Sequence, residues 1–190
     1  GDGTVGANKN SIKIIGDHTD KYVQGYFFYD SKKSGGITVS HLRFGDTPIQ
    51  SAYLIDSADF VQCSNPSYIT RYNMTGDIKE GGTFLFNTSA KSAEELENVL
   101  PASVKNDIAK KNINLYVIDA IKIAAELGLR GRTNTILQSA FFKVANIIPY
   151  DQAVEYMKKM AYKSFAKKGD AIVQMNYNAI DSAAANLIKI

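Results

Sequence analysis

The first eleven residues are the strongest candidate for chemistry in the chain. Gly1, Gly3 and Gly6 match the pattern G-x-G-x-x-G, and Lys9 follows between two asparagines. Glycine allows positive φ and a close approach of the backbone, so a loop of this composition can bring bare N–H groups against phosphate. A following helix would add the positive end of its dipole. These residues predict a phosphate-binding loop that leads into the periodic segment Ile12–Ile15.

The same glycine pattern also occurs in dinucleotide-binding folds, where it follows a strand and precedes an acidic residue by about 20 positions. Here the pattern begins at residue 1, and no single acidic residue stands out among Asp17, Asp20 and Asp30. A nucleotide site and a tight turn without a ligand both remain open on this pattern alone.

Four basic residues are expected in or beside glycine-rich turns and not on helix faces. They are Lys9, Lys32, Lys33 and Arg43. Several phosphates held by lysine and backbone N–H would suit a nucleotide or coenzyme A. The alternative is that these loop lysines are simply solvated.

Other chemistries lack the residues they need. His18 and His41 are the only histidines, and Cys63 is the only cysteine. These three residues do not complete a convincing zinc site. One cysteine also excludes a four-cysteine iron–sulfur cluster held by this chain alone. Cys63 is predicted to be a buried, inert thiol. No nucleophile elbow or complete P-loop occurs, so neither a catalytic residue nor a metal ligand is predicted.

Composition places the chain among ordinary globular proteins. It has 190 residues, 45% of them hydrophobic and 22% charged, with a net charge of +3. That charge is too small to indicate nucleic-acid binding. No apolar run approaches the ~20 residues of a membrane span. A single cysteine fits a reducing cytoplasm, which is the predicted location.

Hydrophobic patterns predict alternating strands and helices, followed by a helical C-terminal third. The predicted strands are Tyr22–Tyr29, Ile37–Phe44, Ile49–Ile55, an interior strand Ala58–Cys63, Thr83–Asn87 and Leu115–Ile118. The predicted helices are Tyr68–Tyr72, Ser92–Val99 with a capping box to Glu95, Pro101–Lys110, Asp119–Leu127, Thr135–Ile147, Asp151–Lys167 and Ala179–Ile190. The fold class is therefore α/β, a layered domain with a central mixed sheet flanked by helices. The mixed character is expected because the strands between Tyr22 and Leu54 follow one another through short turns.

We expect residues 1–190 to form a single domain. The chain starts without methionine and without a strand before its glycine pattern. It is therefore interpreted as a fragment excised from a longer multidomain polypeptide.

Four segments together resemble a known family. They are Asp2–Ser11, Tyr29–Gly36, Val39–Gly45 and Gly81–Phe84. They closely resemble the gamma-type domain of pyruvate:ferredoxin (flavodoxin) oxidoreductase, of the 2-oxoacid:ferredoxin oxidoreductase family. Arg132-Thr133-Asn134 and the segment after it fit the same resemblance, which covers essentially the whole chain.

The resemblance implies an oxidoreductase that decarboxylates pyruvate to acetyl-coenzyme A and carbon dioxide and passes electrons to ferredoxin or flavodoxin. It implies that thiamine diphosphate, Mg²⁺ and [4Fe-4S] clusters lie on other domains of the same polypeptide, in an enzyme that is a homodimer. This fragment alone is expected to be inactive. Its share would be the capture of coenzyme A and closure over the active site.

On that resemblance, backbone N–H groups of Gly3, Thr4, Val5 and Gly6 would meet the phosphates of coenzyme A. Lys9, Lys32 and Lys33 would supply charge, with Arg43 and Asn134 as further contacts. Three alternatives stay open: a Rossmann-like domain that binds NAD or FAD, a purely structural packing domain without a ligand, and a parent enzyme that accepts another 2-oxoacid.

Overall fold

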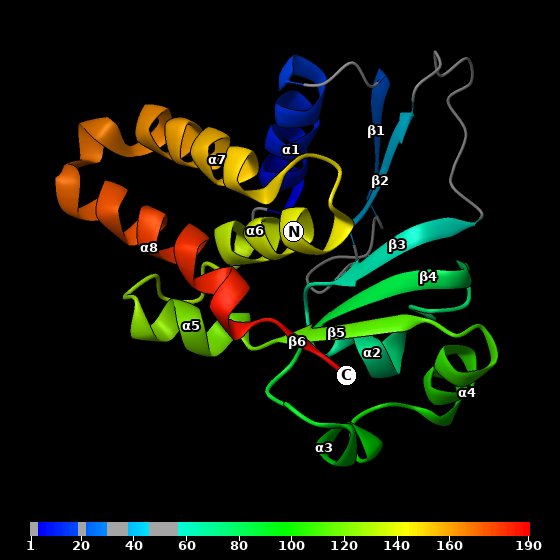
Figure 1. Ribbon diagram of the computed structural model, residues 1–190. Coiled ribbons are helices and arrows are strands. Elements are labelled where there is room, and N and C mark those ends of the chain that lie inside the picture. The colour runs from blue at the N-terminus through cyan, green and yellow to red at the C-terminus, as the bar shows by residue number, and fades with distance from the viewer. Residues whose placement is uncertain (1–3, 19–21, 30–37, 46–56) are drawn as a thin grey trace.

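The fold is described from a computed structural model, shown in Figure 1, which describes residues 4–18, 22–29, 38–45 and 57–190. The strands are β1 (Tyr22–Tyr29), β2 (Thr38–Gly45), β3 (Ala58–Cys63), β4 (Ile78–Asn87), β5 (Asn114–Ile118) and β6 (Ile188–Lys189). The helices are α1 (Thr4–His18), α2 (Tyr68–Arg71), α3 (Ala93–Glu97), α4 (Ala102–Lys110), α5 (Ala120–Glu126), α6 (Asn134–Ala145), α7 (Tyr150–Phe165) and α8 (Asp170–Asn186), with a 3₁₀ turn, η1 (Ala166–Lys168).

The central sheet has four described strands in the order β3-β4-β5-β6. β3, β4 and β5 run parallel, with Val61 opposite Phe84 and Phe84 opposite Leu115. β6 runs antiparallel to β5, with Ile188 opposite Val117. The sheet is therefore mixed, as predicted, although its antiparallel member comes from the end of the chain.

Alternating side chains divide the core between the two faces of this sheet. Phe84, Phe86, Leu115 and Val117 belong to one buried cluster, together with residues of α2, α3 and α4. Leu85 and Ile118, their neighbours along the strands, belong to a second cluster with α5, α6 and α8. Figure 1 shows these two groups of helices on opposite sides of the sheet. The layered α/β fold is confirmed.

A third cluster adds an outer layer beyond α6 and α8. Ile14 and Ile15 of α1 are buried there with Phe141 and Phe142 of α6 and with Met157 of α7. The ring of Phe60 in β3 meets Phe141 edge-on, with their centroids 5.3 Å apart. The outer layer is thus joined to the sheet through aromatic packing, and α1 is fixed by its C-terminal half.

β1 and β2 form a separate antiparallel pair, with Gln24 opposite Arg43. Both strands were predicted, the second one residue early at each end. The predicted strand Ile49–Ile55 lies outside the described residues.

Three sequence predictions were wrong, all of them at the boundaries of elements. The glycine stretch is helical from Thr4 onward, so α1 starts well before Ile12. The last predicted helix starts nine residues earlier than Ala179, at Asp170, and the chain ends in β6, not in a helix. β4 begins before its glycines, at Ile78. β3 is the first strand in the described order, and residues 46–56, which include the predicted strand Ile49–Ile55, lie outside the described part, so an interior position of β3 stays a prediction.

Within the part of the chain that is described, no helix is long and apolar enough to cross a membrane. The same residues contain no group of three or more histidine, cysteine, aspartate or glutamate side chains that could hold a metal ion.

Candidate functional site at the start of helices α1 and α6

A hydrogen-bonded triangle joins the beginning of α1 to the beginning of α6. The Gln138 amide nitrogen donates to the carbonyl oxygen of Ala7 and to the hydroxyl oxygen of Ser11, both at 3.0 Å. Ser11 in turn donates to the Ala7 carbonyl, also at 3.0 Å. Ser11 is only 3% exposed. The triangle therefore fixes the first turns of α1 against the second turn of α6.

This contact brings together two regions that the sequence analysis singled out separately. Gly6 precedes Ala7 in the first turn of α1, and Asn134 starts α6 one turn before Gln138. Since a helical turn rises about 5.4 Å, both residues lie within roughly one turn of the triangle. Lys9 is exposed on the same part of α1. The structure thus brings Gly6, Lys9 and Asn134 into one neighbourhood.

The remaining predicted residues are placed less completely. Thr4 and Val5 form the start of α1, and Arg43 lies in β2; their side chains are outside the described part of the structure. Gly3, Lys32 and Lys33 are outside it altogether.

Two structural expectations about these residues need correction. Thr4, Val5 and Gly6 belong to a helical first turn and not to a loop, and Lys9 lies on a helix and not in a glycine-rich turn. The reason is that burial of Ser11, Ile14 and Ile15 outweighs the low helix propensity of glycine. The N–H groups of a first helical turn have no partner within the helix, so a helical start is compatible with the predicted contact between backbone N–H groups and an anion.

The starts of α1 and α6 lack the acidic first turn that α7 and α8 have, a feature that they share with α2, α4 and α5. Neither α1 nor α6 has an acidic residue in its first turn, and the residue before α6, Thr133, makes no capping bond with its side chain. By contrast, α7 and α8 carry Asp151 and Asp170 in their first turns. A helix start without an acid keeps its positive dipole end available to an external anion.

Gly6 and two arginines, Arg130 and Arg132, lie in or next to these two helix starts. A Cβ at Gly6 would meet no described atom within 4 Å, so internal packing of the described residues does not require a glycine there. Arg130 and Arg132 are exposed in the turn that leads into α6, where Arg130 and Gly131 adopt φ of 48° and 82°. Exposed basic side chains, those of Lys9, Arg130 and Arg132, therefore belong to the segments that start α1 and lead into α6.

Sequence reasoning missed Gln138 and did not assign Arg130 or Arg132 to the site. Gln138 lies four positions after Asn134, and this spacing puts two residues on one face of a helix. That spacing was the available signal, but a glutamine in a helix has the ordinary appearance of a solvated polar residue.

A second polar cluster lies at the carboxyl ends of the parallel strands. Asn87, the last residue of β4, is 1% exposed. Its amide donates to the Ser64 carbonyl at 2.8 Å and accepts from the Ala120 backbone N–H at 3.0 Å. Open α/β sheets bind ligands at this edge. Here the amide of Asn87 is used to tie together the segments that follow β3 and β5, which is a structural role.

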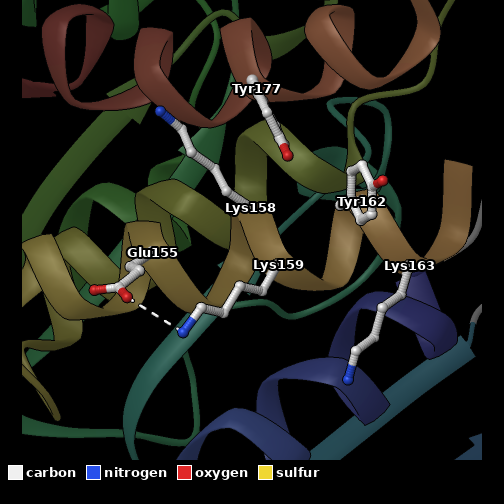
Figure 2. Close-up of a pocket in the computed structure, with 6 residues that line it drawn as sticks. All are labelled: Glu155, Lys158, Lys159, Tyr162, Lys163 and Tyr177. Atoms are coloured by element: carbon white, nitrogen blue, oxygen red, sulfur yellow. Dashed lines mark ion pairs between the residues drawn. The ribbon is translucent and has the colours of Figure 1, made fainter. Parts of the chain in front are cut away.

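A surface groove of about 440 Å³ lies between α7 and α8, as Figure 2 shows. Its lining residues are Glu155, Lys158, Lys159, Tyr162, Lys163 and Tyr177. Two of its lysines already have carboxylate partners: Lys158 pairs with Asp181 at 2.8 Å and Lys159 with Glu155 at 3.2 Å. None of the predicted site residues lines it, so the groove is the weaker candidate for an anion.

Cys63 is not suited to nucleophilic chemistry. Its side chain is fully buried, and its thiol donates to the Asn65 carbonyl at 3.2 Å. Burial raises the pKa of the Cys63 thiol from 9.0 to about 12, and the hydrogen bond to Asn65 offsets only part of that rise. The prediction of a buried, inert thiol is confirmed. The side chains of His18 and His41 lie outside the described residues.

The sequence model of the family described as pyruvate ferredoxin/flavodoxin oxidoreductase matches residues 1–186. The chain belongs to this family. It is 61% identical over 189 residues to the pyruvate:ferredoxin oxidoreductase of Moorella thermoacetica, and 55% identical to the pyruvate-flavodoxin oxidoreductase of Enterobacter agglomerans. Each match covers the whole chain but only 16% of the relative's length. The family predicted from the sequence is confirmed.

Solved structures of 2-oxoacid oxidoreductases share the fold. A pyruvate oxidoreductase subunit from Thermotoga maritima superposes with a TM-score of 0.74 at 21% identity, covering 98% of this chain and 91% of the subunit. The 2-oxoglutarate:ferredoxin oxidoreductase of Magnetococcus marinus, solved with 2-oxoglutarate, coenzyme A and succinyl-CoA bound, gives a TM-score of 0.67 at 17% identity and covers 97% of this chain and 28% of that one. At these identities the likeness concerns the fold.

Proposed function

We propose that this chain is one domain of an enzyme that oxidatively decarboxylates pyruvate to acetyl-coenzyme A and carbon dioxide, with electrons passed to ferredoxin or flavodoxin. Membership of the pyruvate ferredoxin/flavodoxin oxidoreductase family supports this proposal. So do relatives such as the Moorella thermoacetica pyruvate:ferredoxin oxidoreductase, of whose length the chain spans 16%. The other domains of such a polypeptide would be its immediate partners, in a cytoplasmic homodimer.

The proposed share of this domain is to bind the phosphates of coenzyme A. The observation that carries this is the junction of the α1 and α6 starts, where two helices without an acidic first turn meet through Gln138. Backbone N–H groups of Gly3, Thr4, Val5 and Gly6 would face the phosphates. Lys9, Lys32, Lys33, Arg43 and Asn134 would add charge and hydrogen bonds.

The residues of this chain do not suit the other cofactors of the reaction. A [4Fe-4S] cluster takes four cysteine thiolates, and the chain has one cysteine, which is buried. The clusters would therefore be held by other domains, and we place thiamine diphosphate and its Mg²⁺ ion there as well, where they would supply the decarboxylation chemistry.

Replacing both Lys32 and Lys33 with Ala in the full-length enzyme tests the coenzyme A site. The matched control is Lys167→Ala with Lys168→Ala, which removes an adjacent, exposed lysine pair from η1. We expect the KM for coenzyme A to rise about tenfold in the first variant, because two charge-assisted contacts are lost, while the KM for pyruvate and the control variant stay unchanged. Unchanged coenzyme A kinetics would remove this lysine pair from the site.

Calorimetric titration of the full-length enzyme with coenzyme A and with NAD separates the remaining alternatives. Binding of coenzyme A that weakens with added salt supports the basic phosphate site. Binding of NAD alone would favour a Rossmann-like dinucleotide domain. If Lys32, Lys33, Lys9 and Gly6 variants all bind coenzyme A as the parent enzyme does, the domain has a packing role.

A further inference from the structure

Gln138 uses its amide group to connect two helices at the point where each of them starts. Both of its observed hydrogen bonds run to α1, one to the Ala7 carbonyl and one to the Ser11 hydroxyl. The side chain is half-buried and Ser11 is buried, so water competes poorly for these bonds. The contact therefore specifies where the first turn of α1 lies relative to α6.

The described first turn of α1, Thr4–Ala7, has a low intrinsic helix stability. It contains Gly6, and a glycine inside a helix costs about 1 kcal/mol relative to alanine. These four residues include no acid that could interact with the helix dipole. Helix ends with these features fray, and a frayed turn does not present its N–H groups in a fixed direction.

The bond from Gln138 reaches the carbonyl of Ala7, which is the residue directly after Gly6. This hydrogen bond therefore anchors the first turn of α1 through a carbonyl group and uses none of the backbone N–H groups of that turn. The same residue lies one turn after Asn134, so the anchor also sets the distance between the two helix starts.

We propose that Gln138 is a positioning residue for coenzyme A: it holds the first turn of α1 in a fixed helical arrangement beside the start of α6, so that both helix starts meet the phosphates together. This rests on the proposed function of the domain. Donors that are fixed in place before a ligand arrives bind it more tightly than donors that must first be ordered. The hydrogen bonds of Gln138 therefore act on affinity for coenzyme A through Gly6 and its neighbours.

Two substitutions in the full-length enzyme test the proposal. Gln138→Met keeps the length of the side chain and removes both donors. Gln138→Glu keeps its shape but places an acceptor against the Ala7 carbonyl. The matched control is Gln174→Met on α8, where the exposed glutamine amide bonds only within its own helix, to Asn178 at 2.9 Å. Steady-state kinetics with each substrate varied and hydrogen exchange of residues 4–11 are the readouts.

We expect Gln138→Met to raise the KM for coenzyme A about three- to tenfold, and Gln138→Glu to raise it by at least as much. The kcat and the KM for pyruvate should stay unchanged in both variants. Amides of residues 4–11 should exchange faster in both variants and not in Gln174→Met. A merely structural role would lower thermal stability and total activity without this split between the two KM values.

The Ser11→Ala variant removes another corner of the same triangle and keeps the test valid if a Gln138 variant fails to fold. It should raise the KM for coenzyme A in the same direction, and the double variant should add less than the sum of the single effects. If the Lys32 and Lys33 variant weakens coenzyme A but Gln138 and Ser11 variants do not, the positioning role is wrong and the proposed function stands. If none of them alters coenzyme A kinetics, the proposed share of this domain in coenzyme A binding fails, and the positioning role fails with it.

Discussion

The starts of α3 and α5, which side chains cap and which we call closed, can be compared with the starts of α1 and α6 in the candidate site, which we call open. The shorter helices α2 and α4 resemble α6, since they too lack a side-chain cap and an acidic first turn. At α5, the Asn87 side chain accepts from the Ala120 N–H at 3.0 Å and Asp119 accepts from the Lys122 N–H at 3.1 Å. At α3, Ser92 accepts from the Glu95 N–H at 3.2 Å and Glu95 accepts from the Lys91 N–H at 3.0 Å. At α1 and α6 no acidic residue lies in the first turn.

The difference separates structural helix starts from the candidate site. A closed start has its donors satisfied by side chains of the same chain, so it contributes to stability and has little left for a ligand. An open start gives up part of that stability and keeps donors and dipole available. The comparison predicts that substitutions at closed starts change stability, whereas substitutions at open starts change coenzyme A binding.

Asn87→Ala should have the largest effect and should act on stability. Removing the amide leaves the half-buried Ser64 carbonyl and the buried Ala120 N–H without their partner, which costs about 3 kcal/mol in total. Chemical denaturation measures this loss. Asn178→Ala is the control, because Asn178 is exposed on α8 and the cost there should stay below about 0.5 kcal/mol. Equal effects of the two substitutions would contradict a central role for Asn87.

Gly6→Asp should have the next largest effect, with opposite signs for folding and for binding. A carboxylate in the first turn of α1 stabilises the helix by about 1 kcal/mol, since it interacts with the dipole and replaces glycine. The same carboxylate repels phosphate, so the affinity of the full-length enzyme for coenzyme A should fall about tenfold or more. Calorimetry measures both quantities.

The neutral variant Gly6→Asn isolates the charge, because asparagine and aspartate have nearly the same shape. It should lose less affinity than Gly6→Asp. If the aspartate variant binds coenzyme A as tightly as the asparagine variant, the first turn of α1 does not face the phosphates.

Ser92→Ala at α3 should lower the free energy of unfolding by about 1 kcal/mol, because the Glu95 N–H loses its acceptor. Coenzyme A binding should not change. Ser92→Asp retains an acceptor and should restore stability. If removing this cap changed the affinity for coenzyme A, the proposed distinction between closed and open helix starts would be wrong.

Asn134→Asp should have the smallest effect. It adds a carboxylate at the start of α6 without changing the shape of the side chain, so α6 gains about 0.5 kcal/mol while the affinity for coenzyme A falls about threefold. Isothermal titration and thermal unfolding of the same variant check both parts. Tighter binding of coenzyme A would show that the start of α6 does not receive an anion.

Local signals predicted much of the fold. Runs of aromatic and β-branched residues gave the bounds of β1 and β3 correctly, and the Ser92–Glu95 spacing predicted the bond from the Glu95 N–H to Ser92. The partner of the Glu95 carboxylate is the Lys91 N–H and not that of Ser92, which is a detail of loop geometry that spacing does not contain. Short-range rules succeed where neighbours in sequence decide the conformation.

The errors occur where distant contacts decide. Glycines suggested a loop at residues 1–11, but buried contacts of Ser11, Ile14 and Ile15 extend the helix back to Thr4. At the other end of the chain, the apolar residues Leu187 and Ile188 continue a helical stripe, yet pairing with β5 makes Ile188 and Lys189 a strand. The same limit applies to the candidate site. The residue types at Gly6 and Asn134 could be recognised in the sequence, whereas the hydrogen bond that joins their helices, from Gln138 to Ala7, spans 131 positions of the chain and could not.

The pairing of β6 with β5 has a consequence for the order of folding. Phe84 and Leu115 are neighbours in the parallel part of the sheet and lie 31 positions apart, whereas Val117 and Ile188 lie 71 positions apart. Closing longer stretches of chain slows the formation of a contact, so β6 should join a sheet whose three parallel strands are already in place. In pulse-labelling experiments, protection of the Ile190 amide, which donates to the Leu115 carbonyl at 2.9 Å, should then lag behind protection of the β4 and β5 amides. On a ribosome that order would be enforced, because β3, β4 and β5 leave the exit tunnel well before the strand that completes their sheet.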